Sequence, residues 1–138
     1  MIREIVKDLD FLSQKSLPFD FINDKDVIAD LLDTANSFGL RCAGLASIQI
    51  GRPVRAVVVR SSETSFMVLI NPTIFSRKDP YTSTEGCLSL EGERQVTRYR
   101  TIKVSYYNSA GKMVLKEFRG FLAKAIQHEV DHLNGVLI

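Results

Sequence analysis

The C-terminal part of the chain contains the segment FLAKAIQHEVDHL, residues 121–133. Its residues are good helix formers and its apolar positions recur three or four apart, which predicts a helix with one buried face. His128 and His132 are the only two histidines of the chain, and they flank Glu129. Because residues four apart lie on one helix face, both imidazoles can reach one metal ion while the glutamate reaches a water beside it. The segment therefore predicts a catalytic metal site.

A third protein ligand is expected upstream, because the six residues after His132 include no strong side-chain ligand. A thiolate suits an ion that two imidazoles already hold, and the chain has two cysteines, Cys42 and Cys87. Both stand among small residues, where the backbone can approach another element closely. Spacing alone fits either cysteine.

Two other interpretations of the same residues stay open at this point. In the first, both cysteines join both histidines in a closed structural zinc site, which leaves no position for water. In the second, the chain is an HExxH endopeptidase. The short segment after His132 argues against the second, because the third ligand of such enzymes usually lies well downstream of the motif.

Hydrophobic periodicity predicts the remaining elements. Apolar residues at helical spacing, closed by Gly39, indicate a helix over about 25–38, and a short helical turn is compatible with 10–15. Alternating β-branched and aromatic residues predict strands, with a hairpin turn at 108–111; the strands are expected at 54–60, 66–71, 101–108 and 113–118. The predicted fold class is α+β, with antiparallel β-sheets around a central metal-binding HExxH helix and one further N-terminal helix.

The amino-acid composition limits the classes of protein to which the chain can belong. The 138 residues, of which 45% are hydrophobic and 25% charged, predict a single globular domain over 1–138. A net charge of +2 gives no reason to expect DNA or a membrane as a partner. The stretch that holds Arg94, Arg98, Arg100 and Lys103 is interpreted as a solvated strand face rather than an RNA-binding surface. Charges throughout residues 1–8 argue against a signal peptide, so a cytoplasmic protein with free thiols is expected.

Three segments together resemble the signature motifs of the peptide deformylase family, in the family's order. They are GLASIQIG at 44–51, EGCLS at 85–89 and QHEVDHLNG at 127–135. The chain departs from the usual family pattern at three positions: Cys42 stands where glycine is usual, Ser47 where alanine is usual and Glu91 where proline is frequent.

The resemblance implies that Cys87, His128 and His132 bind one divalent metal ion, with water in the fourth position. Two imidazoles and a thiolate suit several ions, so ligand type does not select one. The family resemblance favours Fe²⁺ in the cell, with Zn²⁺, Ni²⁺ or Co²⁺ as substitutes.

The resemblance also assigns the catalytic groups. Glu129 would act as general base and then as general acid, while the Gln49 side chain and the Leu88 backbone N–H would stabilise the oxyanion. Such roles suit the hydrolysis of a formamide, which needs an activated water, a proton for the departing amine and donors for the developing negative charge.

The resemblance further implies a substrate site, with some positions holding the substrate main chain and others lining a pocket for the methionine side chain. The main-chain positions are Gly44, Ala43, Gly86 and Arg94. Helix spacing adds Phe121 and Lys124, which lie seven and four residues before His128, near the same face, and are expected to line the approach to the metal. Lys124 departs from the apolar character of the family's pocket. Two interpretations of it are about equally supported: its stem packs on the pocket wall with the ammonium in water, or it is simply a solvated helix lysine.

The function that the resemblance implies is removal of the N-formyl group from the N-terminal methionine of newly made polypeptides, with release of formate. The expected partners are N-formylmethionyl nascent peptides. Most members of the family continue into a further helix that assists ribosome docking in some of them, whereas this chain stops at Ile138. A short form without that docking element is expected, in a bacterial cytoplasm or in that of a bacteriophage's host.

Overall fold

The computed structural model describes residues 1–138 and contains one five-stranded antiparallel sheet with the strand order β1-β2-β3-β4-β5. The strands are β1 (Gly44–Ala46), β2 (Ala56–Arg60), β3 (Phe66–Glu85), β4 (Arg94–Tyr107) and β5 (Met113–Arg119). The helices are α1 (Leu9–Leu12), α2 (Lys25–Ser37) and α3 (Gly120–Leu133), with short 3₁₀ turns at Gly39–Arg41 and Ser47–Ile50. The predicted α+β class with antiparallel pairing is confirmed.

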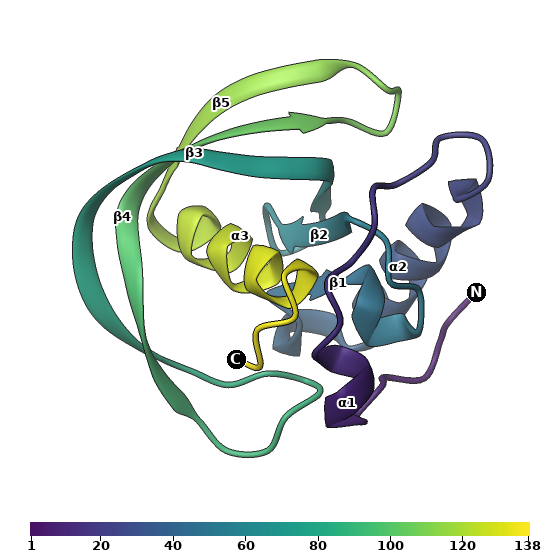
Figure 1. Cartoon of the computed structure of the whole chain (residues 1–138), viewed down its shortest axis with the longest axis horizontal. Coiled ribbons are helices and arrows are strands. Elements are labelled where there is room, and N and C mark those ends of the chain that lie inside the picture. Colours follow the sequence, from purple (N-terminus) through teal and green to yellow (C-terminus); the bar gives the residue numbers. More distant parts are fainter.

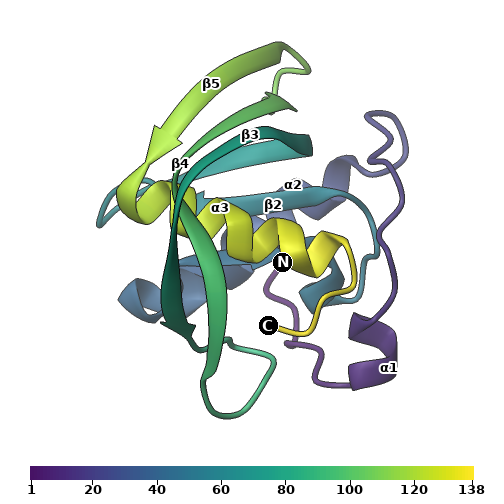
Figure 2. The ribbon, with the colours of Figure 1, turned by 60° about the vertical axis from the view of Figure 1, so that its left-hand side comes forward.

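Helix α3 lies in the middle of the molecule. The long strands β3 and β4 curve around one side of it, and β1 and β2 lie on another (Figure 1). A view turned by 60° shows the same helix running through the hollow of the bent sheet (Figure 2). Its face of Ala123, Ile126, Val130 and Leu133 is buried in the larger core, close to the apolar stripe that the sequence predicts. Each large apolar side chain buried in this way stabilises the fold by about 1.5–3 kcal/mol.

Strand β2 separates two hydrophobic cores. Val57 and Val59 belong to the core around α3, whereas Ala56 and Val58 belong to a second core under α2. All four side chains are buried, which explains why this strand reads as a continuous apolar run instead of an alternating one. Helix α2 contributes Val27, Leu31 and Ala35 to the second core.

Strands β3 and β4 are much longer than the sequence pattern predicts. The predicted strand at 66–71 ends where Asn71 and Pro72 read as a break, yet β3 continues to Glu85. Asn71 adopts a left-handed conformation (φ 51°), and the pairing of β3 with β4 shifts register there and again between Ile74 and Ser76. Such bulges bend a strand without ending it. The irregular residues therefore curve the sheet around α3.

Other elements agree with the sequence or extend it. The predicted helix over about 25–38 is α2, and the optional turn near residue 10 is the separate helix α1. The three-residue strand β1 escapes prediction because so short a segment shows no period. None of the helices has the length and apolarity that a membrane crossing requires.

Gln127 fixes α3 to the sheet. Strand β5 pairs with β4 only as far as Arg119 and Thr101, which leaves the next backbone groups of β4 without a strand partner on that side. The Gln127 side chain takes their place: Oε1 accepts from the Tyr99 N–H at 2.9 Å, and Nε2 donates to the Tyr99 carbonyl at 2.9 Å. Nε2 also donates to the Ala123 carbonyl at 2.9 Å. One amide thus satisfies three backbone groups.

We expect Gln127→Glu to lower the free energy of unfolding by about 1–3 kcal/mol, because a carboxylate cannot donate to the two carbonyls. The measurement is urea denaturation followed by circular dichroism. Gln95→Glu, at an exposed position of β4, is the matched control and should change the midpoint little. Equal midpoints for the two variants would show that the Gln127 amide does not hold the helix.

Candidate metal centre

Three side chains converge where the C-terminal half of α3 meets the turn after β3. Their ligand atoms, the Cys87 Sγ and one ring nitrogen each of His128 and His132, all lie within 4.8 Å of one another. The Nε2 atoms of the two histidines are 3.2 Å apart, and Cys87 Sγ is 3.3 Å from His132 Nε2. The structure thus brings together the two histidines and one of the two candidate cysteines.

The donor set fits a metal ion. A tetrahedral ion with ordinary Zn–N and Zn–S bonds holds two nitrogens about 3.3 Å apart and a sulfur about 3.5 Å from each nitrogen. The observed separations are close to these values. Burial and repulsion from His128 lower the pKa of His132 to about 3, which keeps that ring neutral, as a ligand must be. The pKa of His128, by contrast, is raised to about 10 despite its burial, by hydrogen bonds to Cys87 and Glu85, so a metal ion would displace a proton from that ring. The geometry of the three atoms suits a cation between them.

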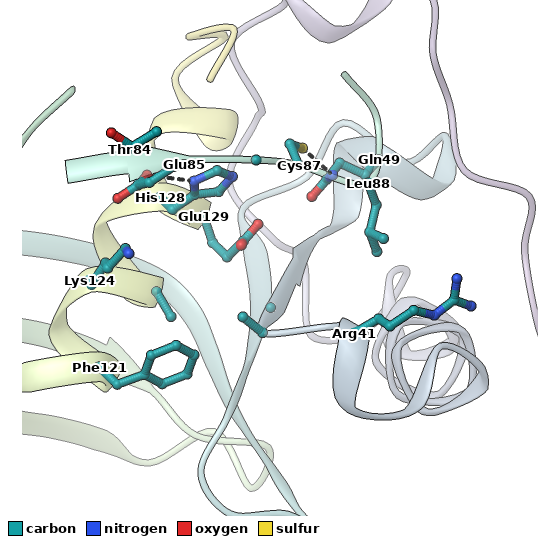
Figure 3. Close-up of a pocket in the computed structure, with 14 residues that line it drawn as sticks. Arg41, Gln49, Thr84, Glu85, Cys87, Leu88, Phe121, Lys124, His128 and Glu129 are labelled. Atoms are coloured by element: carbon teal, nitrogen blue, oxygen red, sulfur yellow. Dashed lines mark hydrogen bonds and ion pairs between the residues drawn. The ribbon is translucent and has the colours of Figure 1, made fainter. Parts of the chain in front are cut away.

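Glu85 orients the first of these ligands. Its Oε1 lies 2.8 Å from His128 Nδ1 (Figure 3). The opposite ring nitrogen, Nε2, therefore faces the other donors and lies 3.2 Å from His132 Nε2. A carboxylate on the outer nitrogen of a metal-binding histidine fixes its tautomer and raises its basicity. Burial alone would raise the pKa of Glu85, but hydrogen bonds from His128 and Arg98 lower it to about 2. Glu85 is therefore ionised.

The interpretation of Arg98 as part of a solvated strand face is wrong. Its side chain is 4% exposed, and Nε and Nη2 both donate to the Glu85 carboxylate. Nη1 donates to Asp131 Oδ2 at 2.6 Å. A buried charge needs such partners, and Arg98 supplies the positive charge that keeps Glu85 ionised. The sequence contains a signal for this role of Arg98, because its acidic partners Glu85 and Asp131 lie inside the second and third motifs.

Glu129 lies beside the converging ligands on α3. Its side chain is buried, and Oε1 has no hydrogen-bond partner in the protein. Burial raises the pKa of Glu129 to about 7. The backbone of Gly44 passes close by: a Cβ atom there would meet Glu129 Oε2 at 2.9 Å and the Val58 carbonyl oxygen at 3.0 Å. Gly44 therefore leaves space for the Glu129 carboxylate. The unpartnered oxygen of this carboxylate is available to exchange a proton with a molecule bound in the site.

Gln49 is held in one orientation from two sides. Its Oε1 accepts from the Ala46 N–H at 3.0 Å, and its Nε2 donates to Ser89 Oγ at 3.1 Å and lies 3.4 Å from Cys87 Sγ. The side chain is almost completely buried. These contacts direct the amide nitrogen toward the metal ligands. Ser89, which the sequence analysis left without a role, is thus a positioning group.

The converging residues form one end of a cavity of about 390 Å³. Ala43, Gly44, Gly86 and Leu88 line it near that end, and Phe121 and Lys124 line it along α3. Arg41 and Thr84 are lining residues that the sequence analysis did not select. Figure 3 shows Phe121 and Lys124 on one wall and Arg41 on the opposite wall.

Two sequence candidates lie apart from this arrangement. Arg94 is not among the residues that line the cavity; its Nη2 donates to the Glu91 carbonyl at 3.0 Å. Cys42 is buried, its Sγ lies 3.3 Å from the Gly44 carbonyl oxygen, and it is absent from the metal-ligand group. Burial and the nearby Glu129 carboxylate raise the pKa of the Cys42 thiol to about 12. The geometry therefore gives no support to a closed site with two thiolates.

Known proteins resemble the chain over its whole length. Residues 2–138 match the family model described as polypeptide deformylase. A peptide deformylase from Clostridium beijerinckii is 42% identical over 138 residues, which is 100% of both chains. A peptide deformylase structure from Legionella pneumophila superposes with a TM-score of 0.90 at 33% identity, covering 99% of this chain and 83% of that one.

A second similar structure is described as having a bound peptide. It is a peptide deformylase from Acinetobacter baumannii, described as bound to Met-Ala-Ser, with a TM-score of 0.87 at 28% identity, covering 99% of this chain and 96% of that one. The family model and the full-length relative agree with the three motifs and with the geometry of the site. The chain therefore belongs to the peptide deformylase family.

Proposed function

We infer that this protein is a peptide deformylase, a metal-dependent hydrolase that removes the N-formyl group from the N-terminal methionine of newly made polypeptides and releases formate. The observation that carries this function is the site itself. Three ligand atoms converge at one end of a cavity, and the unpartnered oxygen of Glu129 lies beside them. The full-length similarity to a peptide deformylase supports the same activity.

Cys87, His128 and His132 would hold the metal ion. When bound, such an ion activates water at neutral pH and polarises the carbonyl that the water attacks. We propose Fe²⁺ as the ion in the cell on the basis of the family resemblance. Zn²⁺, Ni²⁺ or Co²⁺ could substitute for it, because two nitrogens and one thiolate accept all four ions. Glu85 and Arg98 would hold the His128 ring in position for this task.

Glu129 would move the proton. A pKa near neutrality lets one carboxyl group first accept a proton from the attacking water and then deliver it to the departing amine. Its free Oε1 is available for both transfers, and Gly44 leaves the space in which the side chain lies.

Gln49 and the Leu88 backbone N–H would stabilise the negative charge that develops on the former formyl oxygen. The fixed orientation of the Gln49 amide supports this role, because a donor that is already in place needs no reorganisation in the transition state. Loss of one such donor typically costs about 2.7–4 kcal/mol.

Substrate binding would involve the backbone at Ala43, Gly44 and Gly86 and the pocket wall of Phe121 and Lys124, all of which line the cavity. Arg94, outside the cavity lining, stays a predicted contact for substrate farther from the formyl group. The peptide Met-Ala-Ser in the Acinetobacter baumannii structure supports a pocket for methionine at the N-terminal residue. We further propose that residues 1–138 act as one catalytic domain on nascent peptides in the cytoplasm.

Formate release tests the function directly. We expect the metal-loaded protein to release formate from formyl-Met-Ala-Ser, and Glu129→Ala to lose at least about 100-fold in kcat because proton transfer is lost. The measurement is an enzymatic formate assay together with metal analysis, which should show the same metal content in both proteins. Glu63→Ala, in an exposed loop, is the control and should match the wild type.

Absence of formate release by a folded, metal-loaded protein would contradict the proposed function. Activity of Glu129→Ala within tenfold of wild type would contradict the role of that residue alone.

The Glu85 contact generates a prediction about metal affinity. We expect Glu85→Gln to weaken metal binding about 10–100-fold, because His128 loses the charged partner that raises the basicity of its ring. Competition with a chromophoric chelator measures the affinity, and circular dichroism checks the fold. Glu117→Gln, an exposed position on β5, is the control. An affinity equal to that of the control would limit Glu85 to a structural role.

A further inference from the structure

The cavity carries two cationic side chains on opposite walls. Lys124 extends from α3, and Arg41 extends from the 3₁₀ turn Gly39–Arg41 (Figure 3). Neither forms an ion pair with an acidic side chain, whereas Arg52 and Arg98 do. The Arg41 guanidinium contacts Phe38, with Nε donating to the Phe38 carbonyl and Cζ 5.5 Å from the centre of the ring, which leaves Nη1 and Nη2 without a protein partner. Both positive charges are therefore free to meet a ligand.

The acids of the cavity do not neutralise these charges. Glu85 is already bound by Arg98 and His128. Glu129 lies on α3 between the two histidines and is buried. Lys124 and Arg41 thus bring unpaired positive charge to the lining of the cavity, which favours a ligand with a carboxylate.

Helix geometry indicates which part of a peptide reaches Lys124. Lys124 precedes His128 by four residues, which is about 6 Å along the helix axis. An extended peptide advances about 3.4 Å per residue, so two residues span about 7 Å. A peptide that extends along α3 from a formyl group at the metal ligands therefore brings its second residue level with Lys124. The aliphatic stem of Lys124 can line the pocket for the side chain of the first peptide residue, while its ammonium group contacts the side chain of the second residue.

We propose that Lys124 and Arg41 make this site selective for formylated peptides whose second residue is acidic, aspartate or glutamate. The selectivity rests on the proposed deformylase function and names a substrate class within it. Neither cation contributes to the chemical step, so the preference acts through binding and is expressed in KM rather than in kcat.

The test compares two formylated peptides of the same shape, formyl-Met-Asp-Ala and formyl-Met-Asn-Ala, which differ at the second residue by one charge. We expect kcat/KM to favour the aspartate peptide by about three- to tenfold at low ionic strength, as two exposed charge pairs allow. The preference should fall below about twofold in 0.5 M salt.

Variants assign the preference to its residues. Lys124→Met has nearly the length of lysine without its charge and should reduce the preference, whereas Lys124→Arg should retain it. Combining Lys124→Met with Arg41→Met should abolish it. Lys112→Met, in the exposed β4–β5 turn, is the control and should keep the wild-type preference. Because the preference is a ratio measured on one protein sample, partial inactivation of a variant cancels out.

Equal kcat/KM for the two peptides in the wild type would overturn the selectivity and leave the deformylase function intact. A preference that survives in the double variant would overturn the assignment to these two residues. Release of formate from neither peptide would overturn the proposed function, and the selectivity with it.

Discussion

Burial of α3 inside the curved sheet is the constraint on which the rest of the structure depends. Ile126, Val130 and Leu133 occupy the core that β2, β3 and β4 surround, so the helix has little freedom to rotate. That packing directs His128 and His132 toward the turn after β3, where Cys87 meets them. The same hydrophobic contacts therefore stabilise the fold and determine the geometry of the metal ligands.

The polar groups in this interior form a connected set in which burial costs are offset. Arg98 binds Glu85 and Asp131, and Glu85 in turn binds His128. Moving an isolated charge out of water costs several kcal/mol. Arg98 pairs with two acids, so the attraction between these charges offsets the desolvation cost that each group would have alone. Glu129 Oε1 and His132 Nδ1 are exceptions, because each is buried without a hydrogen-bond partner. An enzyme retains such a group where a substrate or water completes its contacts.

The sequence predicts the local elements and the ligands that share one helix, and it fails where contacts join distant segments. The α3 pattern and the two histidines are visible because helical spacing alone brings them to one face. Spacing along the sequence does not show whether Cys42 or Cys87 is the ligand, because that depends on where the bent strand β3 ends. The family motifs indicate Cys87. The role of Arg98 is hidden for the same reason: it reads as one of several exposed basic residues until the curved strands bring Glu85 and Asp131 to it. Strand β3 is longer than its sequence pattern predicts, because Asn71 and Pro72 resemble a strand end whereas bulges let the pairing continue.

The most direct test of this account is the coordination shell of the metal-loaded protein. X-ray absorption of the zinc-loaded chain should show one sulfur at about 2.3 Å, with the remaining ligands being nitrogen or oxygen at about 2.0–2.2 Å. The sulfur contribution should persist in Cys42→Ser and disappear in Cys87→Ser. Two sulfur ligands in the wild type, or a sulfur signal that survives Cys87→Ser, would contradict an open site built from Cys87, His128 and His132.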